Sequence, residues 1–100
     1  DMEGSRGLGD VYKRQPELRQ NFPNPFNPTT HIEFDIANEG FVSLRIFDVL
    51  GKEVATLVNR QMPPGRYRFT WDARGVESGV YFYQLKTDTF IQSRRLLLLK

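Results

Sequence analysis

Apolar and polar residues alternate along most of the chain after residue 31, which is the pattern of half-buried β-strands. The alternation is clearest where Tyr67, Phe69 and Trp71 are separated by arginine and threonine. The same period of two predicts strands over residues 32–36, 42–47, 52–58, 66–71, 80–87 and 90–99. Residues 80–87 carry apolar side chains on both faces, which predicts a central strand. Residues 52–58 also suit a short helix by composition, but their length and β-rich surroundings favour a strand.

Turn signals separate these segments at intervals of roughly 8–12 residues. They include Gly51, the Pro63-Pro64-Gly65 step and the Ser78-Gly79 step. No helix of ordinary length is predicted. We therefore expect an all-β fold, an immunoglobulin-like β-sandwich of about seven strands, with Trp71 near the centre of its core.

Residues 23–30, which we call the strap, read PNPFNPTT and place three prolines within six positions. Proline fixes φ and lacks an N–H, and it pushes the residue before it, here Asn24 or Asn27, toward extended geometry. The strap is therefore predicted to be stiff and extended, neither a helix nor a central strand. Its one large apolar side chain, Phe26, is expected to pack on the domain that follows.

Composition divides the chain into three parts. Residues 1–15 are expected to be non-native or disordered, because residues 5–15 (SRGLGDVYKRQ) resemble a translated sequencing adapter at the end of a metagenomic reading frame. Residues 16–21 are expected to be a linker, and residues 22–100 to form the sandwich. On this interpretation the chain is the carboxyl-terminal end of a longer protein.

Size and composition exclude several classes of function. One hundred residues suit a single small domain, and no run of 18 or more apolar residues encodes a membrane-spanning helix. The net charge of +2 is spread among scattered basic residues, which argues against a nucleic-acid partner. The chain has no cysteine, which excludes disulfides, thiolate catalysis and cysteine-bound zinc.

Catalysis is not expected from this chain. His31 is the single histidine, and it has no carboxylate at metal-ligand spacing, so we expect neither a metal nor a cofactor. The serines that could act as nucleophiles have no other base, and no nucleophile-elbow or phosphate-binding motif surrounds them. Asp48 and Asp72 are expected to bond the backbones of turns.

Several blocks of sequence, taken together, resemble a known family. They are FPNPFNPTT at residues 22–30, VSLRIFDVLG at 42–51, SGVYFYQL at 78–85, and a terminal basic pair, aliphatic run and lysine at 94–100. In this order they resemble the immunoglobulin-like carboxyl-terminal sorting domain of the type IX secretion system, over residues 22–100. His31 and the leucine-rich last strand depart from the family pattern.

The resemblance implies a targeting domain without activity or cofactor of its own. It implies an upstream cargo domain in the same protein, transit through the periplasm, and passage through an outer-membrane translocon to the medium or the cell surface. In many such cargoes a sortase-like surface peptidase removes the domain and attaches the cargo to anionic lipopolysaccharide. The expected place for such a cut is residues 16–21.

The candidate recognition residues lie in the strap, beside the Ser-Gly step and at the end of the chain. They are Asn24, Pro25, Phe26, Asn27, Pro28, Gly79, Tyr81, Arg94, Arg95 and Lys100. Each has a structural alternative: the strap covers one end of the sandwich, Gly79 admits the next strand, Tyr81 packs beside Tyr83, and the basic residues keep the last strand from aggregating. A terminal strand at a sheet edge would also let a receptor strand pair with its free backbone groups.

Two other functions stay open from the residues alone. The first is an immunoglobulin-like or fibronectin-like module that binds carbohydrate or mediates adhesion, with exposed aromatics stacking on sugar rings. The second is a structural immunoglobulin-like domain of the kind found in flagellar hook-capping proteins.

Overall fold

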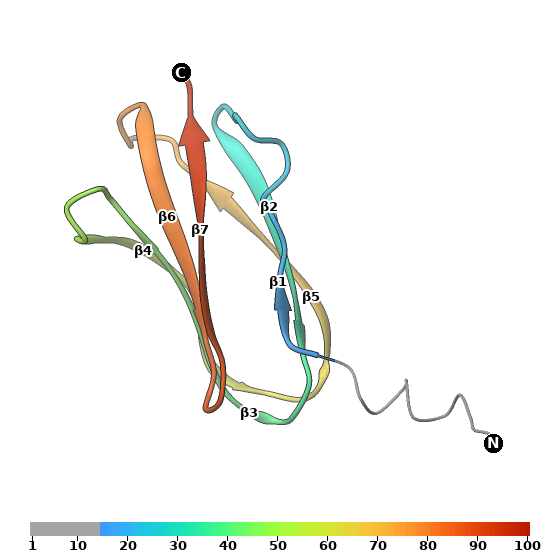
Figure 1. Cartoon of the computed structure of the whole chain (residues 1–100). Coiled ribbons are helices and arrows are strands. Elements are labelled where there is room, and N and C mark those ends of the chain that lie inside the picture. Colours follow the sequence, from blue (N-terminus) through green and yellow to red (C-terminus); the bar gives the residue numbers. More distant parts are fainter. Residues whose placement is uncertain (1–14) are drawn as a thin grey trace.

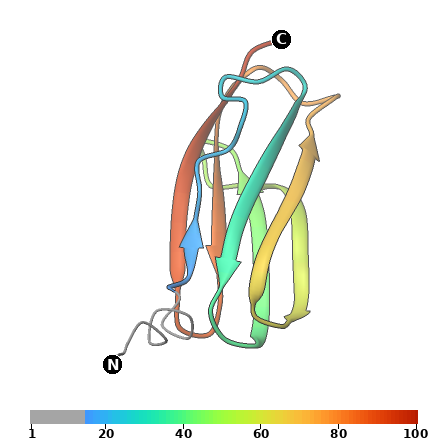
Figure 2. The ribbon, with the colours of Figure 1, turned by 90° about the vertical axis from the view of Figure 1, so that its right-hand side faces the viewer.

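The computed structural model describes residues 15–100, which form two antiparallel sheets packed face to face (Figures 1 and 2). The strands are β1 (Glu17–Leu18), β2 (Thr29–Ile36), β3 (Gly40–Phe47), β4 (Glu53–Met62), β5 (Gly65–Asp72), β6 (Gly79–Lys86) and β7 (Ile91–Leu98). One sheet has the order β1-β2-β5 and the other the order β4-β3-β6-β7. The predicted all-β sandwich is confirmed.

The core lies between the two sheets and is built from alternate positions of each strand. Ile32, Phe34 and Ile36 point inward from β2, and Leu44 and Ile46 point inward from β3. These side chains are buried because a strand sends successive residues to opposite faces. Burial of this apolar surface is the main favourable contribution to folding.

Strand β6 is central, as predicted, with β3 on one side and β7 on the other. Its inward side chains Tyr81, Tyr83 and Leu85 are all buried. Trp71 is also buried, but it lies at the end of the core rather than at its centre. It pairs with Thr30, the last residue of the strap.

Strand β4 continues beyond the expected strand over residues 52–58 and ends at Met62. The added residues pair with the first half of β3, and Met62 is buried opposite Gly40. The sequence did not predict this extension because residues 59–61 are polar. They are polar because β4 is an edge strand and these positions are exposed to water. The turn is therefore confined to Pro63 and Pro64.

The expected linker over residues 16–21 differs from what the structure has there. Glu17 and Leu18 form β1, which pairs antiparallel with Asp35 and Phe34 of β2. Leu18 is completely buried and Asn21 is 3% exposed. Two paired residues are too short to give a periodic signal, so only tertiary contacts identify them as part of the sandwich. The expectation for residues 1–15 lies outside the described residues, except for Gln15.

Candidate recognition site

The strap lies along the end of the last strand, β7. The Phe26 amide donates to the carbonyl oxygen of Leu97 at 3.0 Å, and the Leu99 amide donates to the carbonyl oxygen of Phe26 at 3.0 Å. The Leu97 amide donates to Oδ1 of Asn24 at 3.0 Å. Phe26 alone pairs with β7, as a parallel bridge opposite Leu98. The predicted extended geometry is otherwise wrong: the chain bends at residues 23–25 and 27–28 on either side of Phe26, and Thr29 and Thr30 begin β2, the middle strand of its sheet.

Phe26 anchors the strap in the core, as predicted, and is 2% exposed. Its ring lies 5.7 Å from that of Trp71, and Trp71 lies edge-on to Tyr81 at 5.8 Å. Aromatic pairs at these separations are attractive beyond the area that they bury. The strap, β5 and β6 therefore share one aromatic cluster.

Buried hydrogen bonds hold the start of the strap. The Asn21 amide group donates to the carbonyl oxygen of Pro23 at 3.1 Å and to Oγ1 of Thr30 at 3.0 Å. The Tyr83 hydroxyl accepts from the Asn21 backbone amide at 2.8 Å and donates to the carbonyl oxygen of Arg19 at 2.7 Å. Burial of this hydroxyl raises the pKa of Tyr83 to about 12. Nothing in the sequence pattern marked Asn21 or Tyr83 for this role, because their partners are distant in sequence.

Strand β7 is an edge strand of the four-stranded sheet, but its edge is only partly free. The outward backbone groups of Leu97 and Leu99 bond the strap, and the carbonyl oxygen of Arg95 accepts from the Gln20 amide group at 2.8 Å. Alternate residues of a strand point their N–H and C=O groups to the same edge, so the backbone groups of Ile91 and Ser93 face the same edge of β7 as those of Arg95 and Leu97. The strap does not reach these two residues. A receptor strand could therefore pair with the first half of β7 without displacing the strap.

The three basic residues at the end of the chain do not form one cluster. Arg94 faces inward, and its Nε donates to the carbonyl oxygen of Leu18 at 2.6 Å, which joins β7 to β1. Arg95 is exposed on the opposite face of the strand. Lys100 is exposed beyond the strand end, with its backbone amide donating to Oγ of Ser78 at 2.9 Å. Arg94 is thus tied to the fold, whereas Arg95 and Lys100 are accessible.

The remaining candidate residues are also of two kinds, those held by contacts within the fold and those exposed at the surface. Gly79 has a φ of 152°, in the region that favours glycine, where it starts β6 opposite Leu98. Tyr81 is 8% exposed and its hydroxyl donates to the carbonyl oxygen of Glu77 at 2.6 Å. The carbonyl oxygen of Pro28 accepts from the Ala73 amide at 2.8 Å, while Asn27 is exposed.

A shallow hollow of about 230 Å³ brings three of the candidates together. Asn24 and Pro25 of the strap form one wall, and Val80, Arg95 and the end of β7 form the other. The Asn24 side chain is fixed by its bond to β7, so the hollow is preformed. An apolar floor beside one guanidinium suits a short segment carrying an apolar side chain and a carboxylate.

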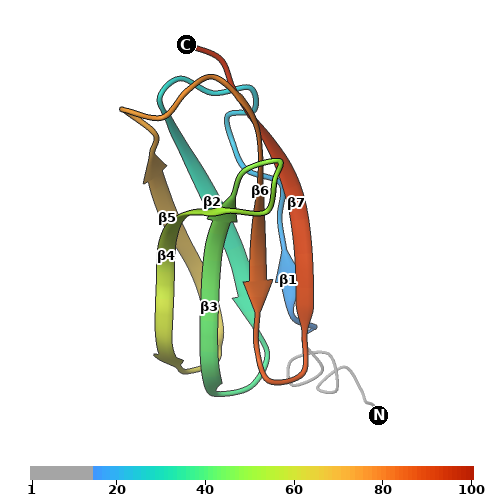
Figure 3. The ribbon, with the colours of Figure 1, turned by 90° about the vertical axis from the view of Figure 1, so that its left-hand side faces the viewer.

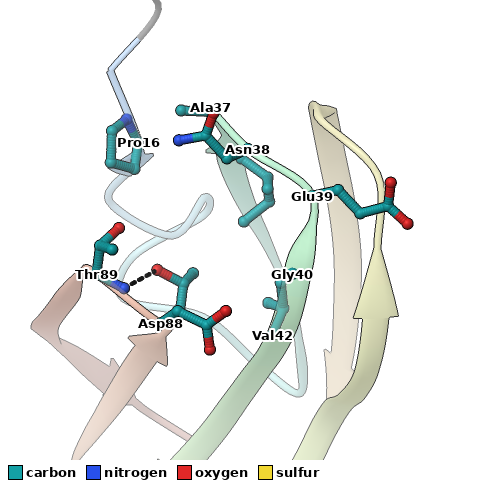
Figure 4. A pocket seen from close by; sticks show the side chains of 10 residues that line it. Pro16, Ala37, Asn38, Glu39, Gly40, Val42, Asp88 and Thr89 are labelled. Carbon is teal, nitrogen blue, oxygen red and sulfur yellow. Dashed lines mark hydrogen bonds between the residues drawn. The ribbon is translucent and has the colours of Figure 1, made fainter.

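A second hollow, of about 140 Å³, opens at the opposite end of the sandwich, near the point where Pro16 enters the fold (Figure 4). Asn38, Glu39 and Thr89 are among its lining residues, from the β2–β3 and β6–β7 turns. Across residues 15–100 we find no group of three metal-ligating side chains, and no helix of the length and hydropathy that crossing a bilayer requires.

Residues 20–99 match the family described as the secretion system C-terminal sorting domain. No curated protein matches the chain.

Proposed function

Since the chain belongs to the family of type IX secretion C-terminal sorting domains, we propose that the hollow between the strap and β7 is where the secretion machinery recognises it. The family membership makes the domain a sorting signal for type IX secretion and favours this function over the adhesion, carbohydrate-binding and hook-capping alternatives. It also means that the chain serves an upstream cargo domain and leads it to the cell surface or beyond.

One observation supports the hollow as the contact region. Arg95 is far in sequence from Asn24 and Pro25, yet the three residues line one accessible surface. Phe26, Arg94 and Tyr81 instead make buried or bridging contacts that the fold itself needs. We therefore assign recognition to Asn24, Pro25, Arg95 and the exposed Lys100, and support of the fold to Phe26, Pro28, Gly79, Tyr81 and Arg94. Asn27 is exposed and is assigned to neither group.

Processing is part of the same proposal. A periplasmic intermediate would be passed through an outer-membrane translocon, and a sortase-like surface peptidase would then remove the domain and attach the cargo. Burial of Leu18 and Asn21 argues that the cut lies before Glu17, and not within residues 16–21 as expected from the sequence. A peptidase needs a segment whose backbone is free to enter its cleft, and the backbone of β1 is paired with β2. The domain itself would contribute no catalysis.

The test is a secretion assay with a matched pair of variants. The full chain would be fused to a fluorescent carrier with an inner-membrane export signal, and expressed in a type IX-competent bacterium and in a translocon-null strain. Arg95→Glu should reduce surface and medium fluorescence at least about tenfold, by placing a like charge against an anionic contact. Arg68→Glu reverses another exposed arginine, on the opposite sheet, and should secrete normally.

Two results would reject parts of the proposal. Equal retention of the unmodified fusion in both strains would reject sorting in that host. Normal secretion of the Arg95→Glu variant, with its melting temperature unchanged, would reject the hollow as the contact and leave the sorting function in place.

A further inference from the structure

The two outer faces of the sandwich differ in chemistry. On the three-stranded sheet the outward positions of β2 and β5 are polar or charged, and their charges pair: Arg68 with Glu33 at 3.7 Å, and Arg66 with Asp35 at 3.2 Å. Arg19 also pairs with Asp35, at 3.1 Å. The charged side chains of this face are paired with one another, and its polar surface is compatible with exposure to water.

The outer face of the four-stranded sheet is apolar and cationic. Half of the outward positions on β3, β6 and β7 carry large apolar side chains, namely Phe41, Phe47, Val80, Phe82, Ile91 and Leu97. Three further positions hold the cations Arg45, Lys86 and Arg95, and no position on these three strands holds an acid. None of these cations forms an ion pair among the described residues, and Nε of Arg45 is buried without a hydrogen-bond partner. Acids occur only at the margins, at Asp48, Glu53 and Asp88.

The β3–β4 turn adds an apolar tip to this face. Figure 3 looks onto the four-stranded sheet, and the turn crosses in front of β6 on the viewer's side. Figure 1 agrees, since the turn projects away from the other sheet. Val49 and Leu50 at the tip are 64% and 89% exposed. Leu50 is thus almost wholly in water.

Three backbone amides of this turn are hydrogen-bonded to Asp48. Oδ1 of Asp48 accepts from the backbone amides of Leu50 and Lys52, each at 2.9 Å. The Gly51 amide donates to the carbonyl oxygen of Asp48 at 3.0 Å, and Gly51 adopts a φ of 84°. The tip therefore presents two aliphatic side chains on a turn whose Leu50 and Gly51 amides are already bonded, which lowers the cost of entering a lipid interface.

We propose that the outer face of the four-stranded sheet, with Val49 and Leu50 as the inserting tip, docks onto the surface of an anionic lipid bilayer. The aliphatic tip would enter the boundary between headgroups and acyl chains, and Arg45, Lys52 and Lys86 would lie against the anionic headgroups. The proposal concerns peripheral contact and goes beyond the sorting function.

Other occupants fit this face less well. A second copy placed by a two-fold axis would bring the three cations against their own counterparts, which costs free energy. The upstream polypeptide joins through β1, which belongs to the other sheet (Figure 1). An added peptide strand gains its affinity from backbone bonds at a sheet edge, and the middle of a sheet face offers none.

The test uses the full chain and vesicles of phosphatidylcholine, with or without phosphatidylglycerol, in a co-sedimentation assay at low salt. Binding should require the anionic lipid and should weaken as salt is raised. The double variant Val49→Ser/Leu50→Ser should bind at least about tenfold more weakly, because it loses the apolar insertion. Lys86→Gln should bind about fivefold more weakly.

Matched controls come from outside the face. Phe22→Ser removes a side chain that is 73% exposed on the segment before the strap, and Arg68→Gln removes a cation from the opposite sheet. Both should bind as the unmodified chain does, and melting temperatures would show that all variants fold. Since the chain has no cysteine, Leu50→Cys also provides a unique site for an environment-sensitive dye. Its emission should shift to the blue with anionic vesicles.

Three outcomes would overturn the proposal. The first is equal binding to neutral and anionic vesicles, or no binding to either. The second is an unshifted dye at position 50 while the protein is bound. The third is a Phe22→Ser variant that loses as much binding as the tip variant.

Discussion

The backbone of Phe26 pairs in parallel with that of Leu98, so the strap and the last strand hold each other in place. The two hydrogen bonds of this bridge are both 3.0 Å long, and the Phe26 ring fills the space beside Trp71. The two ends of the domain are therefore one structural unit. A substitution in the strap should therefore destabilise the end of β7, and a truncation of β7 should destabilise the strap.

Truncating Phe26 should be among the most destabilising changes in the strap. Phe26→Ala would remove a ring that is 2% exposed and should lower the free energy of unfolding by about 3–5 kcal/mol. Chemical denaturation followed by the fluorescence of Trp71, the single tryptophan, measures this directly. Phe22→Ala is the matched control, since Phe22 is 73% exposed, and should change stability by less than about 0.5 kcal/mol. Similar losses in both variants would contradict the packing described.

Deletion of residues 96–100 should unfold the strap end of the domain as well as remove the tail. It takes away Leu96 and Leu98, both completely buried, and every backbone bond from β7 to the strap. We expect a large fall in melting temperature and a red shift in Trp71 emission. Deletion of Lys100 alone, which is exposed, should leave both nearly unchanged. If the longer truncation melts like the full chain, any loss of secretion that it causes must come from recognition.

Tyr83→Phe should cost about 1–3 kcal/mol, because the buried Asn21 amide would lose its acceptor while the ring still fits. The phenol should also titrate late, with a pKa of about 12 raised from 10.0 by burial. Absorbance at alkaline pH would show Tyr83 ionising well above pH 10 in the folded protein, and burial also raises the pKa of Tyr81. Because the folded pKa is raised, this tyrosine's contribution to stability is complete below pH 10 and lost as the pH rises toward 12. Tyr67→Phe is the control, since its hydroxyl bond to Pro63 is exposed.

Stability should fall in acid through Asp35. Burial acts to raise the pKa of this carboxyl, but hydrogen bonds from Arg19 and Arg66 outweigh it and lower the pKa below its ordinary value of 3.8. A lowered folded pKa gives stability that is present above the unfolded pKa and is lost as the pH falls through the folded one. Melting temperature should therefore drop below about pH 4.

Asp35→Asn should remove much of this acid dependence and lower stability at neutral pH by about 1–3 kcal/mol. The control is Asp72→Asn. Hydrogen bonds from Arg74 also lower the pKa of Asp72, but that pair is fully exposed, and its loss should matter much less. An acid profile unchanged in Asp35→Asn would contradict the assignment.

The recognition residues were predicted from sequence as a single set, and the structure divides them. The basic pair at positions 94 and 95 looked like one charged signal, yet neighbouring residues of a strand point to opposite faces. Arg94 consequently bonds Leu18, and Arg95 is left on the surface. Tyr81 was a recognition candidate with packing beside Tyr83 as the alternative, and both tyrosines are buried. The packing of Phe26 was predicted correctly, because a large apolar side chain favours burial wherever the chain brings it near the core.

The sequence alone determined the all-β class, most of the strands, a proline-rich segment that is not a helix and has Phe26 packed, and the family. These follow from side-chain periodicity, proline geometry and the order of short motifs, which act over a few residues. Only the tertiary structure decided that Glu17 and Leu18 belong to the sandwich, that the strap covers half of the β7 edge, and that one sheet is left with an apolar, cationic outer face. Each of these depends on which strands become neighbours, and strand neighbours are chosen by the packing of the whole core rather than by any local pattern.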